Sequence, residues 1–214
     1  MDPAPENNSL VRSYLELRTS LGVIGITLPF ILAFGKILLQ SPGLLGSISD
    51  YYYSVMGDVF VGSLCAIGVF LWSYKGYGRT DAVAGNLAAL FALGVAFFPT
   101  TPEVGATALQ MIIGKAHIFF AAGYFLSLAF FALVLFRKTS VNKPPTPMKL
   151  VRNAVYTVCG YAILVCLALI VLVNLFLSDS SVQQLALVFW LESLATVAFG
   201  ISWFVKGEAI LKDG

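Results

Sequence analysis

Long apolar runs separated by short polar segments dominate the sequence. A helix that crosses a bilayer core about 30 Å thick needs about 20 apolar residues. Six stretches qualify, and we predict membrane helices at Thr19–Leu39, Asp58–Tyr74, Asp81–Phe98, Met111–Phe136, Arg152–Leu177 and Leu185–Val205. A segment inside a bilayer must satisfy its own backbone hydrogen bonds, so runs of this length form helices. The pattern therefore predicts an all-α fold, an integral membrane bundle of six transmembrane helices.

The polar segments divide the chain into one membrane domain with short extensions. We expect residues 1–18 to form an N-terminal segment, residues 19–206 the six-helix domain, and residues 207–214 a C-terminal tail. Prolines at positions 144, 145 and 147 favour extended backbone. Residues 138–151 are therefore expected to form a linker between the fourth and fifth helices.

Basic residues distinguish the two sides of the membrane. Of the 13 Lys and Arg residues, only Lys36 and Lys115 lie toward the side opposite the termini. Cytoplasmic loops of membrane proteins carry an excess of Lys and Arg. Both termini and the 138–151 linker are therefore predicted to be cytoplasmic.

Composition supports a membrane protein and narrows its chemistry. Hydrophobic residues make up 58% of the chain and charged residues 11%, with a mean hydropathy of +0.87, whereas a soluble domain carries about 25% charged residues. The sequence has no block of basic residues of the kind that would indicate a nucleic-acid partner. The three cysteines lie in apolar runs without disulfide or zinc spacing. A single histidine, His117, excludes a zinc centre of three histidines.

Polar side chains gather in the outer third of the predicted bundle. Charges inside a membrane are costly, and they usually face the bundle interior and serve a function. His117 is expected about 9 Å below the outer end of its helix, and Glu192 about 10 Å below the outer end of the last helix. Near the same surface lie Lys36, Ser49, Asp50, Tyr52, Asp58, Lys115 and Asn174. We therefore predict an outward-facing polar pocket.

Several of these positions also fit purely structural roles. Lys36 and Lys115 fit side chains that extend to the membrane interface. Tyr52 fits an interfacial aromatic belt, and Asp58 fits a favourable charge at a helix N-terminus. Glu192 is different, because nothing near it in its apolar run neutralises it. Small residues, at 62, 66, 85–89 and 121–123, fit close helix packing.

Acyl transfer or lipid hydrolysis is the first function that fits this layer. His117 would act as a general base, oriented by Glu192 or Asp50. The nucleophile would be Ser47, Ser49 or a lipid hydroxyl, although neither serine lies in a G-x-S-x-G elbow.

Two other functions stay open. A carboxylate-rich metal site would take its ligands from Asp50, Asp58, His117 and Glu192, but the spacing indicates no particular metal or cofactor. A protein without catalysis would bind a lipid head group or conduct an ion, although polar residues are sparse in the inner half of the bundle. The candidate substrate-binding residues are Lys36, Tyr52, Asp58, Lys115 and Asn174.

Four segments carry a family resemblance. They are ISDYYYSVMGDVFVGSLCAIGVFLWSYKGY (Ile48–Tyr77), NLAALFALGVAFFPT (Asn86–Thr100), KAHIFFAAGYF (Lys115–Phe125) and LESLATVAFGISWF (Leu191–Phe204). In this order they resemble the DRAM family of six-helix membrane proteins, which includes autophagy modulators and GPI-remodelling relatives. The resemblance places Ser49, Asp50, His117 and Glu192 at the family's recurrent polar positions and implies a role in lipid remodelling or trafficking. The short loops resemble an uncharacterised bacterial branch, which implies the bacterial inner membrane.

The leading hypothesis is a membrane protein that binds or modifies lipids in a pocket centred on Asp50, His117 and Glu192. The alternative is a transporter, channel or scramblase that uses the same residues to bind an ion or a head group. A third possibility is a scaffold that recruits partners through residues 138–150. The expected partners are membrane lipids and, in an oligomer, a second copy of the chain.

Overall fold

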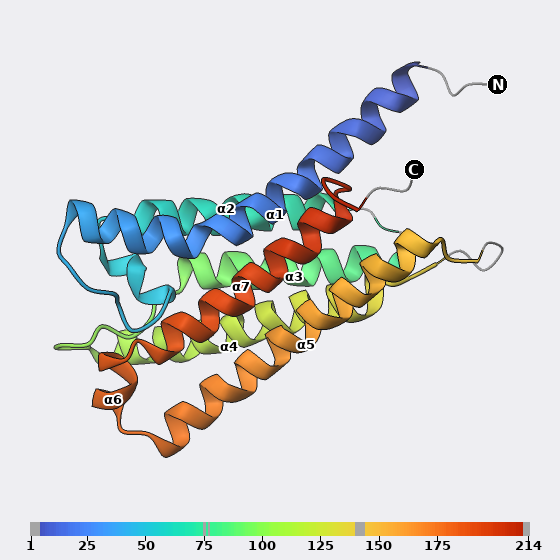
Figure 1. Ribbon diagram of the computed structural model, residues 1–214. Helices are drawn as coiled ribbons and strands as arrows, with labels where there is room; N and C mark the ends of the chain where they lie inside the picture. The colour runs from blue at the N-terminus through green and yellow to red at the C-terminus, as the bar shows by residue number, and fades with distance from the viewer. Residues whose placement is uncertain (1–4, 75, 77, 140–143, 212–214) are drawn as a thin grey trace.

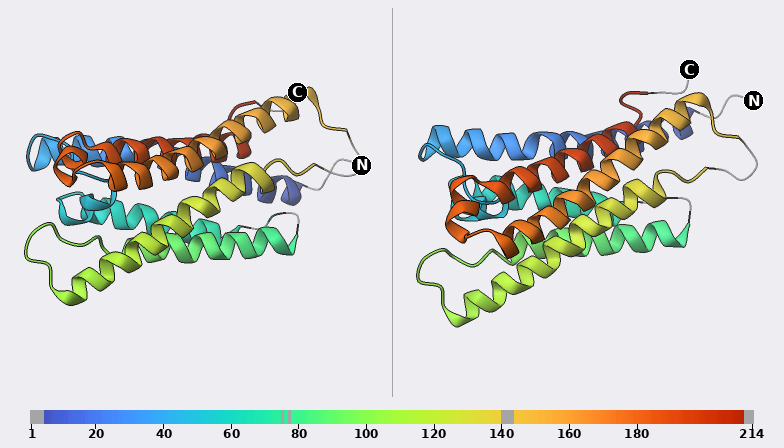
Figure 2. Two further views of the ribbon diagram at one scale, coloured as in Figure 1. Left: turned by 90° about the horizontal axis from the view of Figure 1, so that it is seen from below. Right: turned by 60° about the horizontal axis from the view of Figure 1, so that its bottom comes forward.

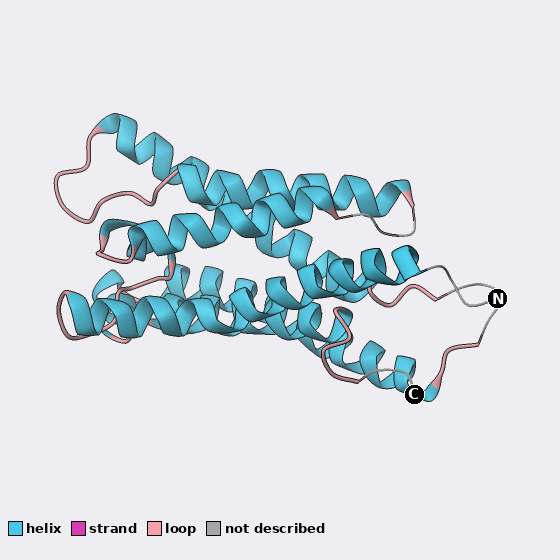
Figure 3. Cartoon of the chain, turned by 90° about the horizontal axis from the view of Figure 1, so that it is seen from above, coloured by secondary structure: helices cyan, strands magenta, loops and turns pink. Residues whose placement is uncertain are grey.

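A computed structural model describes residues 5–74, 76, 78–139 and 144–211, and within these residues every element is helical (Figures 1 and 3). The α-helices are α1 (Pro5–Leu39), α2 (Gly57–Ser73), α3 (Arg79–Phe97), α4 (Ala108–Phe130), α5 (Pro147–Phe176), α6 (Asp179–Gln184) and α7 (Leu187–Lys206). A short 3₁₀ helix, η1 (Ser49–Tyr53), precedes α2, and a π-helical turn, η2 (Phe131–Leu135), continues α4. The all-helical prediction is confirmed for the described residues.

Five of these helices are long and apolar enough to cross a membrane, namely α1, α3, α4 with η2, α5 and α7. The sixth predicted segment, α2, is apolar but has 17 residues. At the rise of an α-helix it extends about 26 Å, slightly less than a bilayer core of about 30 Å. This set of apolar helices fits an integral, multi-pass membrane protein.

The long helices form a closed ring in which each contacts its neighbours in the order α1, α2, α3, α4, α5, α7 and back to α1. The η1 turn, the α3–α4 connection and α6 lie at one end of the bundle, which we call the α6 end (Figure 1). The start of α1, the end of α7 and the starts of α3 and α5 lie at the opposite end, the linker end. Most basic residues of the described chain belong to the linker end, as the topology predicted.

Two helices begin earlier than predicted. Helix α1 begins at Pro5 rather than Thr19, so residues 5–18 extend the first membrane helix instead of forming a separate segment. Helix α5 begins at Pro147 rather than Arg152, because Thr146 accepts a hydrogen bond from the backbone N–H of Lys149 and Pro147 occupies the first helical position. Threonine at the N-cap followed by proline is a strong helix start. The predicted linker is correspondingly shorter, and its residues 140–143 lie outside the described residues.

Two further boundaries differ near the α6 end. Helix α4 begins at Ala108 rather than Met111, because Thr107 and Gln110 form a reciprocal capping box. The short helix α6 was not predicted, and it is separated from α7 by Ala186, whose φ of 47° lies in the left-handed region. This sharp turn lets α6 fold across the end of the bundle before α7 enters it.

The linker end is held by tight packing. Trp203 of α7 is buried and packs against Tyr74, Phe131 and Phe136, with ring centroids 5.0–5.5 Å apart. Asp81 at the start of α3 is fully buried and is joined to Lys138, just beyond η2, at 2.5 Å. These contacts close the bundle at this end.

Candidate functional site

A cavity of about 800 Å³ lies between α4, α5, α7 and the α1–α2 connection, near the α6 end. In the left panel of Figure 2, α4 slants away from α5 and α7 toward this end. The polar residues of its wall are Ser47, Ser49, Asp50, Thr100, His117, Asn174, Gln183 and Glu192. The apolar residues include Phe125, Leu126, Leu167, Val171 and Leu175. Because Leu126, Val171 and Leu175 are themselves exposed, the apolar part of the cavity reaches the side of the bundle, where an integral membrane protein would contact lipid.

Glu192 joins this cavity to the turn that precedes η1. Its Oε2 accepts a hydrogen bond of 2.8 Å from the N–H of Ile48. A reciprocal bond of 2.8 Å runs from the N–H of Phe189 to the carbonyl of Gly46. The turn from residue 46 to 50 is therefore fastened to the first turns of α7 at two points.

The three consecutive tyrosines of η1 differ in exposure, with Tyr51 buried, Tyr52 half-buried and Tyr53 exposed. Tyr51 is fully buried against Phe189, and its hydroxyl accepts from the N–H of Leu45 at 3.5 Å. Burial raises the pKa of Tyr51, although the Leu45 N–H acts in the opposite direction, so the hydroxyl stays neutral at physiological pH. Tyr53 donates to the carbonyl of Thr100 at 2.7 Å. Two of the three tyrosines thus anchor η1 to its surroundings.

His117 is oriented by a backbone group rather than by a carboxylate. Its Nδ1 lies 2.5 Å from the carbonyl oxygen of Phe98, and the ring is buried. Since a carbonyl only accepts hydrogen bonds, Nδ1 carries the proton, and the neutral ring has its lone pair on Nε2. The expected orienting groups, Glu192 and Asp50, form no ion pair with His117 among the residues that the structure describes. His117 is thus set up to accept a proton at Nε2.

Asp50 occupies the same wall. Its Oδ1 accepts a hydrogen bond of 3.2 Å from the hydroxyl of Thr100. It lies within electrostatic reach of both His117 and Glu192. Ser47 accepts from the N–H of Asp50 at 3.1 Å and so caps the turn. Ser49 is buried and lines the cavity. Only Ser47 of these two serines caps the turn.

The predicted substrate-binding residues separate in the structure. Lys36 is buried, but its ammonium donates to the carbonyls of Pro42 and Gly43 at 3.3 and 3.1 Å and so stabilises the end of α1. Asn174 does line the cavity, with its amide donating to the carbonyl of Ile170 at 2.7 Å. The described lining does not include Lys36.

Three other candidates lie away from the cavity wall. Asp58 is exposed in the first turn of α2, where its charge favours the helix N-terminus. Tyr52 packs edge-on against Tyr53. Lys115 is exposed on α4. Within the described chain, no three His, Cys, Asp or Glu side chains gather as the ligands of a metal ion would.

Sequence reasoning missed two groups of this site. The hydroxyl of Thr100 and the carbonyl of Phe98 come from the end of α3 and its following residues, where they position Asp50 and His117. A backbone carbonyl carries no sequence signal, and threonine in a connection is too common to stand out. Both contacts depend on how α3 meets α4.

No family model, curated protein or solved structure matches this chain. Its apolar helices fit a helical, multi-pass membrane protein, and the cavity between them is polar at one end.

Proposed function

We propose that the cavity binds a membrane lipid, with the head group beside Asp50, His117 and Glu192 and an acyl chain along α4 and α5. The observation that carries this proposal is the division of one cavity into a polar end and an apolar remainder that opens toward the bilayer. An amphiphile satisfies both parts, whereas an ion would leave the apolar wall without a partner.

The charged residues of the cavity wall limit which lipid head groups can bind there. Its described residues include the carboxyl groups of Asp50 and Glu192 but no Lys or Arg. Such a wall disfavours a phosphate and favours a head group that donates hydrogen bonds through hydroxyls or an amine. We infer a lipid with a hydroxyl-rich or amino head group.

We further propose that the protein modifies this lipid, with His117 as general base. The Nε2 lone pair, fixed by the Phe98 carbonyl, supports this role. It would remove a proton from a lipid hydroxyl or from Ser49, which lines the same cavity. We also propose that the chain crosses the membrane six times with both termini cytoplasmic, which the basic residues at the linker end support. A relationship to the DRAM family is part of the same proposal and is supported by the four segments that resemble it.

Filling the apolar part of the cavity should expel the lipid. Ala168 is exposed on α5 and lines the cavity, so Ala168→Trp places an indole in the lipid's volume without disturbing the core. We expect the lipid retained by the purified protein in mild detergent, measured by mass spectrometry, to fall about tenfold or more. Val165→Trp is the matched control, because Val165 is exposed on the same helix outside the lining. Equal retention by both variants would contradict lipid binding in this cavity.

Removing the base while preserving its hydrogen bond should separate chemistry from binding. In His117→Asn, the side-chain amide can still donate to the Phe98 carbonyl, but the Nε2 lone pair is gone. We expect lipid retention to persist and turnover to fall by about 10²–10⁴, the usual contribution of a general base. The measurement is the whole-cell lipid profile of a deletion strain that carries wild type or variant at matched expression. If His117→Asn restores the lipid profile fully, His117 is not a catalytic base, and the proposed function is reduced to lipid binding.

A further inference from the structure

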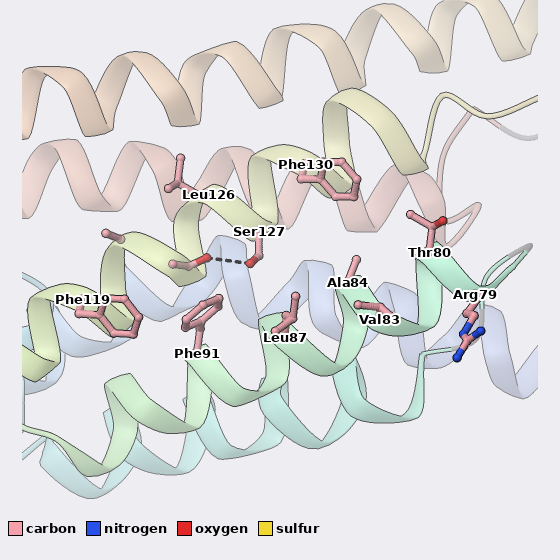
Figure 4. A pocket seen from close by; sticks show the side chains of 12 residues that line it. Arg79, Thr80, Val83, Ala84, Leu87, Phe91, Phe119, Leu126, Ser127 and Phe130 are labelled. Atoms are coloured by element: carbon pink, nitrogen blue, oxygen red, sulfur yellow. Dashed lines mark hydrogen bonds between the residues drawn. The ribbon is translucent and has the colours of Figure 1, made fainter.

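A second groove, of about 880 Å³, runs between α3 and α4 on a different side of α4 (Figure 4). Its apolar walls include Val83, Leu87, Phe91, Phe119 and Phe130. In Figure 4, Arg79 and Thr80 lie at one end of the groove, and Phe91 and Phe119 lie at the other. The groove therefore has one polar end, at the linker end of the bundle, and an apolar length.

The length of the groove corresponds to one leaflet. From Arg79, the first residue of α3, to Phe91 the helix rises about 18 Å. Half of a bilayer core about 30 Å thick is about 15 Å. A lipid whose phosphate lies at the level of Arg79 would thus place its acyl chain along the full groove.

The charge at the polar end favours an anion. Arg79 is exposed, and among the described residues it takes part in no ion pair. The nearest acidic residue in sequence, Asp81, is buried and already joined to Lys138. Arg79 therefore presents a positive charge at the membrane surface that no described carboxylate neutralises.

We propose that the α3–α4 groove binds an anionic phospholipid, with the phosphate at Arg79 and Thr80 and one acyl chain between Phe91 and Phe130. The polar end of this groove, at Arg79 and Thr80, lies at the opposite end of the bundle from the polar end of the first cavity, and it prefers the opposite head-group charge. The two hollows meet only along the ridge of Ala122 and Leu126, which line both. With the linker end cytoplasmic, the occupant belongs to the leaflet in which anionic lipids are concentrated.

Photo-crosslinking in nanodiscs tests this site. The probes are phosphatidylglycerol and phosphatidylcholine that carry the same photoreactive acyl chain, and mass spectrometry maps the crosslinked residues. We expect phosphatidylglycerol to label Leu87 and Ser127 in preference to phosphatidylcholine. Arg79→Gln should reduce this preference about fivefold, which corresponds to about 1 kcal/mol for one basic residue at an anionic surface.

Arg137→Gln is the matched control, because Arg137 is an exposed arginine at the same end that does not line the groove. It should leave the preference unchanged, whereas Leu87→Trp should remove groove labelling by both probes. Equal labelling by the two lipids in wild type would mean ordinary bilayer contact and would overturn the proposal. Equal losses in Arg79→Gln and Arg137→Gln would also overturn it, and so would crosslinks between protein copies in place of lipid.

Discussion

Replacing Glu192 by alanine is expected to destabilise the protein by about 1–3 kcal/mol and to abolish lipid retention. The side chain accepts a hydrogen bond from the N–H of Ile48, which is buried, and a buried backbone donor left without a partner costs about 1–3 kcal/mol. The same turn carries Ser49 and Asp50 to the cavity wall. Without its anchor on α7, the polar end of the cavity loses its geometry.

Glu192→Gln separates these two effects. Glutamine keeps one side-chain oxygen that can accept from the N–H of Ile48 but has no ionisable carboxyl group, so stability should fall less than in Glu192→Ala. Thermal unfolding in detergent and retained lipid are measured on both variants. Glu103→Ala, an exposed glutamate in the α3–α4 connection, is the control and should change neither. If alanine and glutamine destabilise equally, the anchor role of the carboxylate is wrong.

The level of a helical residue along the bundle was predictable from the sequence because the rise of a helix is fixed. His117 and Glu192 lie on different helices, yet counting residues from the helix ends placed them at one level. The structure brings both to one cavity, together with Asp50 and Ser49. For His117 and Glu192, helix rise was sufficient to predict a common level, whereas Ser49 and Asp50 were expected there only as part of the preceding loop.

Rotation about each helix axis was not predictable in the same way. Lys36 and Lys115 were both expected near this layer, but Lys36 donates to the carbonyls that follow α1, and Lys115 is exposed and not part of the described cavity lining. A single sequence gives no partner for either, and the outcome depends on which neighbour each helix meets. The same reason explains why the Phe98 carbonyl, which orients His117, was missed.

The glycines also show which helix contacts can be predicted from a single sequence. Gly85 and Gly123 were predicted to allow close packing, and a Cβ at either position would lie 2.6–2.7 Å from a neighbouring helix, at Leu71 and Phe91 respectively. Gly62 was predicted likewise, but its Cβ would meet nothing within 4 Å. The tightest reciprocal approach, between α1 and α7, joins glycines at opposite ends of the sequence, and no local spacing reveals it.

The close contact between α1 and α7 predicts a large loss of stability for Gly200→Ala. A Cβ on Gly200 would lie 2.5 Å from the backbone nitrogen of Ile26 and 2.7 Å from the carbonyl oxygen of Gly22. Backbone atoms cannot rotate aside as a side chain can, so α1 and α7 must separate, at a cost of about 3 kcal/mol, the upper part of the usual range for overpacking. Because Glu192 lies two turns away on α7, its hydrogen bond to Ile48 should weaken as well.

The control for this variant is Gly62→Ala on α2. Both changes replace a helical glycine by the best helix former, which alone stabilises by about 1 kcal/mol, but only the change at Gly200 introduces a clash. Thermal unfolding in detergent should therefore show a lower melting temperature for Gly200→Ala and an equal or higher one for Gly62→Ala. Lipid retention should fall only in the first variant, since displacement of α7 moves one wall of the cavity. Equal melting temperatures would mean that the α1–α7 contact is looser than the structure has it.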